Sequence, residues 1–514
     1  MFCAMCGNEV KDGAKFCTAC GVKIEKSLAA ENSAEAVAEP TGTADSGVQT
    51  HIKKELQIEN PLPQQTASEP AGTADSGVQK PVKKEIKITH KRAGIIVGAA
   101  VLAFAAIMVS AYISGKTAME RAMDAMERGI RAQAQGDYDL AIENYAQIIK
   151  LAPNAALAYF LRGSAYREKE DYDSAITDYT QGIKLASDVA EYYTFRGDVY
   201  RDKKNYDSAI ADYTQAIQLD PKSAAAYSAR GDAYRYKEDY DSAIADYTQV
   251  IRLEPNDATA YSTRGSAYSY KEDYDSAIAD YTQAIRLDPN NATAYSIRGD
   301  AYRGKRDYDS AIADYTQAIR LDPDYAWAYN NRGDAYRGKK DYDSAIADYT
   351  QVIRLDPNDA WAYNNRGEAY SDKRDYDRAI ADYTEAIRLD PDYSYFYSDR
   401  GDAYYDKRDY NRAIADYTQA IRLNPDRDFA YSSRGSAYYD KGDYDQAIAD
   451  YTQAIKLDPN SAGNYNVRGN AYYAKGDYDR AIADYEAGLR IDPSAAVIRK
   501  NLESTRRDRQ RRGW

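Results

Sequence analysis

A glycine recurs every thirty-four residues through most of the chain. The spacing never slips across the eleven copies, which are Gly129, Gly163, Gly197, Gly231, Gly265, Gly299, Gly333, Gly367, Gly401, Gly435 and Gly469. A period of this length predicts a helix–turn–helix unit repeated in tandem. One such unit cannot bury its apolar face alone, so we expect the units to stack into an all-α solenoid.

Aromatic and small residues recur with the same period of thirty-four residues. With the glycine as position 8, the units begin at residues 122, 156 and so on to 462; Tyr occupies positions 4 and 11 in ten units, and Ala and Tyr occupy positions 20 and 24 in all. Positions 4, 8 and 11 share one stripe of a helix, so the glycine would admit a neighbouring helix between two rings. An Asp-Tyr-Asp sequence near the start of the second helix and Arg or Lys at position 29 complement its dipole.

This pattern resembles the tetratricopeptide repeat over residues 122–495. The resemblance implies a right-handed superhelix of about eleven helix pairs, spanning 116–495, whose first helices line a concave groove. Tyr replaces the usual Trp and Phe, and Arg replaces the usual Leu at position 7. That Arg occurs in every unit, and an acidic residue stands at position 23 in all but the first, which has Asn144. We therefore expect a ladder of ion pairs between helices, each contributing about 0–1 kcal/mol if solvated.

The first helices differ from one another at positions 2, 5, 6, 9, 12 and 13, a stripe that the resemblance places in the groove. The candidate partner-binding residues on this stripe are Trp327, Asn330, Asn331, Asp334, Arg337, Trp361, Asn364, Asn365, Glu368, Tyr395, Asp402, Tyr405 and Phe429. Asn amides can hydrogen-bond an extended peptide backbone, while aromatic rings supply rigid contact area. Drift among solvated residues, with the Trp pair packing between units, is the alternative. Position 9 lacks the consistent Asn of the family's carboxylate clamp, so chaperone tails are not expected.

All four cysteines lie near the N-terminus, as two CxxC pairs ten residues apart: Cys3, Cys6, Cys17 and Cys20. Four thiolates at this spacing predict a structural Zn²⁺ site. Residues 1–24 resemble the short zinc ribbon at the N-terminus of many bacterial membrane proteins. A redox dithiol and a nucleic-acid contact are the alternatives. A segment this short folds only when it holds its metal.

Two further segments separate this ribbon from the repeats. Residues 25–92 are polar and proline-containing, which predicts a disordered linker. Residues 93–115 carry no charge and are long enough for a single transmembrane helix, with membrane lipid around it. More basic residues precede this span than follow it, so we expect the N-terminus in the cytoplasm and the repeats on the extracytoplasmic side of the cell membrane.

The remaining observations narrow the function. Residues 496–514 predict a cap helix and a basic tail with a frayed, solvated end. The net charge of −13 argues against nucleic acid as a partner. Only His51 and His90 could supply histidine chemistry, and no catalytic motif interrupts the units, so we expect neither an enzyme nor a small-molecule substrate. The sequence favours a membrane-anchored scaffold that binds partner polypeptides. The alternative is a regulatory membrane protein whose cytoplasmic zinc ribbon contacts nucleic acid or a transcription partner.

Overall fold

The computed structural model describes residues 116–511, and every regular element in that range is a helix. The first helices of the units are α3 (Lys116–Ala134), α5 (Ala156–Glu168), α7 (Ala190–Asp202), α9 (Ala224–Tyr236), α11 (Ala258–Tyr270), α13 (Ala292–Gly304), α15 (Ala326–Gly338), α17 (Ala360–Asp372), α19 (Ser394–Asp406), α21 (Asp428–Lys441) and α23 (Ala462–Ala474). The second helices are α4 (Tyr138–Leu151), α6 (Tyr172–Leu185), α8 (Tyr206–Leu219), α10 (Tyr240–Leu253), α12 (Tyr274–Leu287), α14 (Tyr308–Leu321), α16 (Tyr342–Leu355), α18 (Tyr376–Leu389), α20 (Tyr410–Leu423), α22 (Tyr444–Leu457) and α24 (Tyr478–Ile491), and α25 (Ala496–Arg511) follows them.

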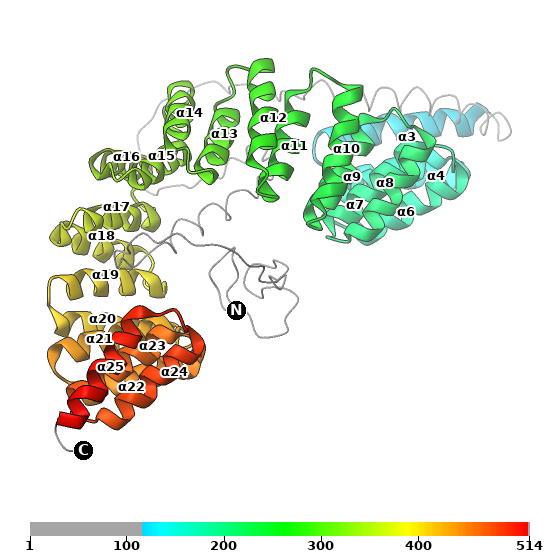
Figure 1. Ribbon diagram of the computed structural model, residues 1–514. Coiled ribbons are helices and arrows are strands. Elements are labelled where there is room, and N and C mark those ends of the chain that lie inside the picture. Colours follow the sequence, from blue (N-terminus) through cyan, green and yellow to red (C-terminus); the bar gives the residue numbers. More distant parts are fainter. Residues whose placement is uncertain (1–115, 512–514) are drawn as a thin grey trace, which may run out of the picture. The chain divides into compact units, whose positions relative to one another are not determined.

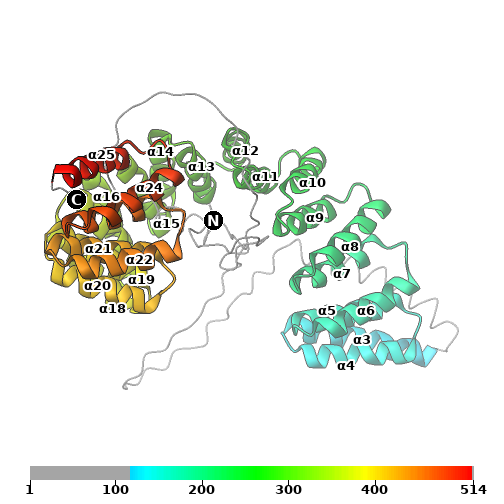
Figure 2. The same ribbon diagram turned by 60° about the horizontal axis from the view of Figure 1, so that its bottom comes forward.

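Each helix packs against the helices before and after it in the chain, as Figures 1 and 2 show. First helices of successive units also touch one another, for example α7 with α9 and α11 with α13. Every unit therefore buries its apolar surface against its sequence neighbours, and the predicted all-α solenoid is confirmed.

Three predicted segments, 1–24, 25–92 and 93–115, lie outside the described residues. Among the helices between residues 116 and 511, none is both long and apolar enough to cross a membrane.

The second helices begin in the same way in every unit. In α12 the carboxylate of Asp273 accepts a hydrogen bond from the backbone N–H of Ser276 at 3.2 Å, and Asp275 lies in the first turn. The side chain satisfies an N–H that has no partner inside the helix, and both charges complement the dipole. Asn205 plays the capping role in α8. The repeated Asp-Tyr-Asp sequence thus fixes where each second helix starts.

The core of each unit is a tyrosine ring from the second helix packed on the glycine of the first. A Cβ at Gly265 would lie 2.7 Å from Cε1 of Tyr281, whose side chain is almost wholly buried. The sequence suggested instead that the tyrosines at positions 4 and 11 would flank this close contact. Those rings, Tyr261 and Tyr268 in α11, are half-buried and lie about the guanidinium of Arg264 at 5.9 and 6.0 Å. Tyr268 also packs against the core cluster that contains Tyr281 and Ile297, so the ring at position 11 contacts both a cation and the neighbouring helices.

The C-terminal basic segment differs from the frayed end that the sequence suggested. Helix α25 continues to Arg511, with Ile498 and Leu502 buried against α24. Arg506 pairs with Glu486 at 2.6 Å and Arg509 with Asp479 at 2.9 Å. The apolar anchor and these carboxylates of α24 hold the basic turns in helical form.

Candidate functional site

The arginine at position 7 forms the ladder that the sequence predicted. In α11, Nε and a terminal nitrogen of Arg264 donate to the two carboxylate oxygens of Asp280 in α12 at 2.8 and 2.7 Å. The remaining terminal nitrogen donates to the hydroxyl of Thr248 in the preceding unit at 3.0 Å. These hydrogen bonds raise the pKa of Arg264. Every rung joins the two helices of one unit, and the rungs from Arg196 to Arg468 also contact a Thr of the preceding unit, so the ladder is part of the scaffold.

The candidate partner-binding residues all lie on four successive first helices. Trp327, Asn330, Asn331, Asp334 and Arg337 are on α15; Trp361, Asn364, Asn365 and Glu368 are on α17; Tyr395, Asp402 and Tyr405 are on α19; Phe429 is on α21. We call the surface formed by positions 2, 5, 6, 9, 12 and 13 of these helices the first-helix face. Side chains of one unit meet those of the next along it.

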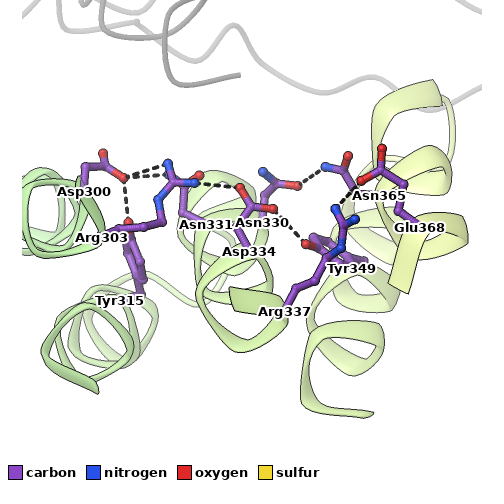
Figure 3. Close-up of polar contacts among 10 residues, drawn as sticks. All are labelled: Asp300, Arg303, Tyr315, Asn330, Asn331, Asp334, Arg337, Tyr349, Asn365 and Glu368. Atoms are coloured by element: carbon purple, nitrogen blue, oxygen red, sulfur yellow. Dashed lines mark hydrogen bonds and ion pairs between the residues drawn. The ribbon is translucent and has the colours of Figure 1, made fainter. Parts of the chain in front are cut away.

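Carboxylates at position 9 hold this face together, as Figure 3 shows. Asp334 accepts a hydrogen bond from the buried hydroxyl of Tyr349 at 2.7 Å. It also forms an ion pair with Arg303 of α13 at 2.9 Å. Arg337 in turn binds Glu368 of the following unit. Three of the candidate residues, Asp334, Arg337 and Glu368, are therefore already engaged within the chain.

Three asparagines on this face form hydrogen bonds through only one of the two polar atoms of the side-chain amide. The Nδ2 of Asn331 donates to Asp300 at 3.1 Å, and the Nδ2 of Asn364 donates to Glu368 at 3.2 Å, while the Oδ1 of each is buried without a partner. Asn330 shows the reverse, because its Oδ1 accepts from Asn365 at 2.9 Å and its Nδ2 has no partner. A buried amide group without a hydrogen bond is unfavourable by about 1–3 kcal/mol.

Aromatic side chains cluster where α17 meets α19. The ring of Trp361 lies 4.8 Å from that of Tyr393 and 5.3 Å from that of Phe396. Tyr395 stacks on Tyr393, and the guanidinium of Arg427 lies 3.6 Å from the centre of the Tyr395 ring. Trp361 thus packs between units, as the alternative interpretation of the Trp pair supposed.

The other two aromatic candidates stand apart from this packing. Phe429, which lies 5.6 Å from the Arg427 guanidinium, keeps 37% of its surface exposed. Trp327 is half-buried on α15, and in the described part of the chain no ring contact joins it to Trp361.

The acidic groups of α19 lie in a region with few cations. Asp402 accepts a hydrogen bond from the hydroxyl of Tyr417 at 2.6 Å, and Tyr405 donates to Asp440 at 2.5 Å. Burial raises the pKa of Asp402 to about 6. Burial, together with the charges of Glu368 and Asp402, raises the pKa of Asp399 well above its usual range. Ionised carboxylates here repel one another.

Sequence reasoning missed several residues of this region. Asp399 occupies position 6, inside the variable stripe, so its charge could have been noticed there. Tyr393 and Arg427 occupy position 34, just before a first helix, and the period alone does not place that position on this face. The period places a tyrosine at position 24 of every unit, but it does not reveal that the hydroxyl of this tyrosine contacts position 9, as that of Tyr349 contacts Asp334.

The predicted zinc ligands Cys3, Cys6, Cys17 and Cys20 lie outside the described residues. Within residues 116–511, no cluster of His, Cys, Asp and Glu is arranged to hold a metal ion.

Family models match the N-terminal segment and the repeat region. A TPR repeat model matches residues 197–235, 231–271, 265–305, 299–339, 333–374, 401–442 and 435–476. Tetratricopeptide repeat models match residues 360–393 and 465–495, and residues 126–181. A zinc-ribbon domain model matches residues 2–23. Among curated proteins, the comparison found no match.

Solved structures with similar repeats include three whole chains. Yeast Tom70 is 15% identical, with 76% of this chain and 96% of that chain covered and a TM-score of 0.40. A chain of the APC/C hetero-tetramer Cut9-Hcn1 is 16% identical, with 78% of this chain and 98% of that chain covered and a TM-score of 0.38. A tetratricopeptide repeat protein from Parabacteroides merdae is 20% identical, with 48% and 98% covered and a TM-score of 0.40. Because the repeat models together match well over half of its residues, the chain belongs to the tetratricopeptide repeat proteins.

Proposed function

We propose that this chain is a membrane-anchored scaffold that binds partner polypeptides on its first-helix face. The carrying observation is the first-helix face, which varies between units on an otherwise repeated scaffold and keeps the ring of Phe429 exposed. Aromatic side chains on such a face supply rigid contact area for a polypeptide. Tetratricopeptide repeat proteins are typically scaffolds without enzymatic activity, and we propose no catalytic role.

Photocrosslinking on intact cells tests the binding face. A photoreactive phenylalanine at Phe429 should crosslink discrete polypeptides, because this side chain is exposed and lies near Arg427, which covers the ring of Tyr395. Leu253, at the end of α10, is equally exposed and gives a matched control on a second helix. Substitution of Tyr395, a half-buried ring on the same face, by Ala should weaken these crosslinks. Equal crosslinking from both positions would contradict the proposal.

The membrane anchor rests on the uncharged segment 93–115. Its length matches the hydrocarbon layer, and the basic residues before it favour a cytoplasmic N-terminus with the repeats outside the cytoplasm. Deletion of residues 93–115 should release the chain from carbonate-washed membranes. Protease added to spheroplasts should degrade the repeats and leave an N-terminal fragment; protection of the repeats would reverse the topology.

The ribbon at residues 1–24 is proposed to hold one structural Zn²⁺ through Cys3, Cys6, Cys17 and Cys20. Four thiolates form a donor set that suits tetrahedral zinc. The purified chain should contain one equivalent of zinc, and Cys17→Ser should lose most of it. A chain that retains its zinc after this substitution would contradict the assignment.

A further inference from the structure

Arginines at position 12 neutralise the carboxylates of the next first helix in part of the array. Arg167 of α5 binds Asp202 of α7 at 2.8 Å and Asp198 at 3.4 Å. Arg337 of α15 repeats this arrangement with Asp372 of α17 at 2.5 Å and with Glu368. In both cases the carboxylates lie thirty-one and thirty-five residues after the arginine.

The same series lacks its cation one unit later. Position 12 of α17 is Ser371, yet α19 still carries carboxylates thirty-one and thirty-five residues further on, at Asp402 and Asp406. Asp402 accepts a hydrogen bond from the hydroxyl of Tyr417, and Asp406 accepts one from the hydroxyl of Tyr376. Within residues 116–511, no ion pair joins either of them, or Asp399, to a basic side chain. The short serine leaves these acids without the guanidinium that Arg337 supplies to Glu368 and Asp372.

A buried amide lies among these acids with an acceptor that has no donor. Asn364 is only 2% exposed, and its Nδ2 donates to Glu368 and its side chain also hydrogen-bonds Asp399. Its Oδ1 has no hydrogen-bond partner. One acceptor among these acids therefore lacks a donor. Ammonium and guanidinium groups carry donors and no acceptors, which makes them the complementary groups.

The surroundings also suit the stem of a long basic side chain. Trp361, Tyr393 and Tyr395 cluster at the junction of α17 and α19, and the charge of Asp399 acts on Tyr393. The electrostatic pull of Arg427 on Asp399 and Asp402 is partial, because its guanidinium is held over the Tyr395 ring. A cation placed between the acids would also reverse the effect of burial, which raises the pKa of Glu368, Asp399 and Asp402.

We propose that a Lys or Arg side chain of the bound polypeptide docks against Asp402, Asp399 and Glu368, in the place that an arginine at position 12 fills in other units. This inference rests on the proposed function, because the first-helix face must bind a polypeptide for the side chain to be presented. It adds the charge of the ligand and the point at which that charge is recognised.

Selection of random dodecapeptides displayed on phage tests both the charge of the ligand and the place where that charge is recognised. The full-length chain in detergent is the target, and selection at pH 7.5 should enrich peptides with a Lys or Arg at one fixed place. A synthetic copy of the best peptide with citrulline, a neutral isostere of arginine, should bind about tenfold more weakly or worse. For a peptide selected with Lys, norleucine replaces the charged residue.

Two variants locate the contact. Ser371→Arg supplies the missing guanidinium from within the chain. It should lower the affinity for the arginine peptide about tenfold and leave the affinity for the citrulline peptide unchanged. Ser269→Arg places the same residue at position 12 of α11 and should change neither affinity more than about twofold. Asp402→Asn keeps the shape of the side chain and should also weaken the arginine peptide. Circular dichroism establishes that each variant is folded.

The outcomes separate the two proposals. Selected peptides without basic residues, or equal binding of the arginine and citrulline forms, would overturn the inference and leave peptide binding intact. Wild-type affinity in both Ser371→Arg and Asp402→Asn would overturn the assigned position. No selected peptide at all would overturn the proposed function itself, together with this inference.

Discussion

The ring of Tyr281 lies against the backbone of Gly265, so close that a Cβ there would be 2.7 Å from Cε1 of the ring. Gly265→Ala should therefore force α11 and α12 apart and destabilise the array by about 1–3 kcal/mol. Urea denaturation followed by circular dichroism measures this loss. Gly463→Ala is the matched control, because its Cβ would find no atom closer than 3.7 Å. Equal effects of the two substitutions would contradict this account of the glycine period.

The ion pair between Arg264 and Asp280 should contribute more than a solvated pair. Its two parallel hydrogen bonds are partly buried, with 18% and 8% of the side chains exposed. A double-mutant cycle with Arg264→Gln and Asp280→Asn should give a coupling energy of about 1–3 kcal/mol. The exposed pair Arg131 and Glu127 in α3 serves as the control and should show no measurable coupling. A coupling energy near zero for Arg264 and Asp280 would mean that the ion pairs fix the register of the helices without adding to stability.

A second ladder, on the turns, is interrupted at one unit. Lys at position 14 pairs with Asp at position 18 of the preceding unit, as in Lys203 with Asp173 at 2.6 Å. Asn411 replaces that Asp opposite Lys441, which forms no ion pair within residues 116–511. Asn411→Asp should raise the thermal midpoint slightly at low salt and lose the gain at high salt. Asp445→Asn, which interrupts the pair with Lys475, should have the opposite effect.

The stability of the array should depend on pH through Asp402. Burial raises the pKa of this carboxyl to about 6 in the folded chain, and in the unfolded chain it is near 3.9. The folded chain then holds a proton that the unfolded chain has released between these values, so stability falls as pH rises from about 4 to 6. The loss is at most about 3 kcal/mol. Urea midpoints across this range should show a smaller decline in Asp402→Asn, and an identical profile would contradict the shifted pKa.

Copying within the chain explains why so much of the fold was predictable. Ten of the eleven units have the same residues at positions 4, 7, 8, 11, 20, 23 and 24, so a structural interpretation of one unit must hold in all ten. The helix pairs, their starts at Asp-Tyr-Asp and the pairing of Arg264 with Asp280 followed from that constraint. The first-helix face varies between units, and no such repetition restricts it.

Contacts between units account for what sequence reasoning did not find. Asn365 donates to Asn330 and Arg337 binds Glu368, although each pair is separated by thirty-one or thirty-five residues. Tyr393 and Arg427 join the face from the turn before a helix, where side-chain direction depends on how the next unit packs. Which candidate residues are engaged and which keep unpaired groups could be read only from these contacts.

By itself the sequence determined the helices, their order and their mutual spacing, because period and side-chain size are local properties copied from unit to unit. Tertiary structure decided that the ring of Tyr281 fills the space at Gly265, and that Ser371 leaves the acids of α19 without a cation. Both depend on the distance between stacked helices, which is set by close packing across the whole unit and not by any one segment of the chain.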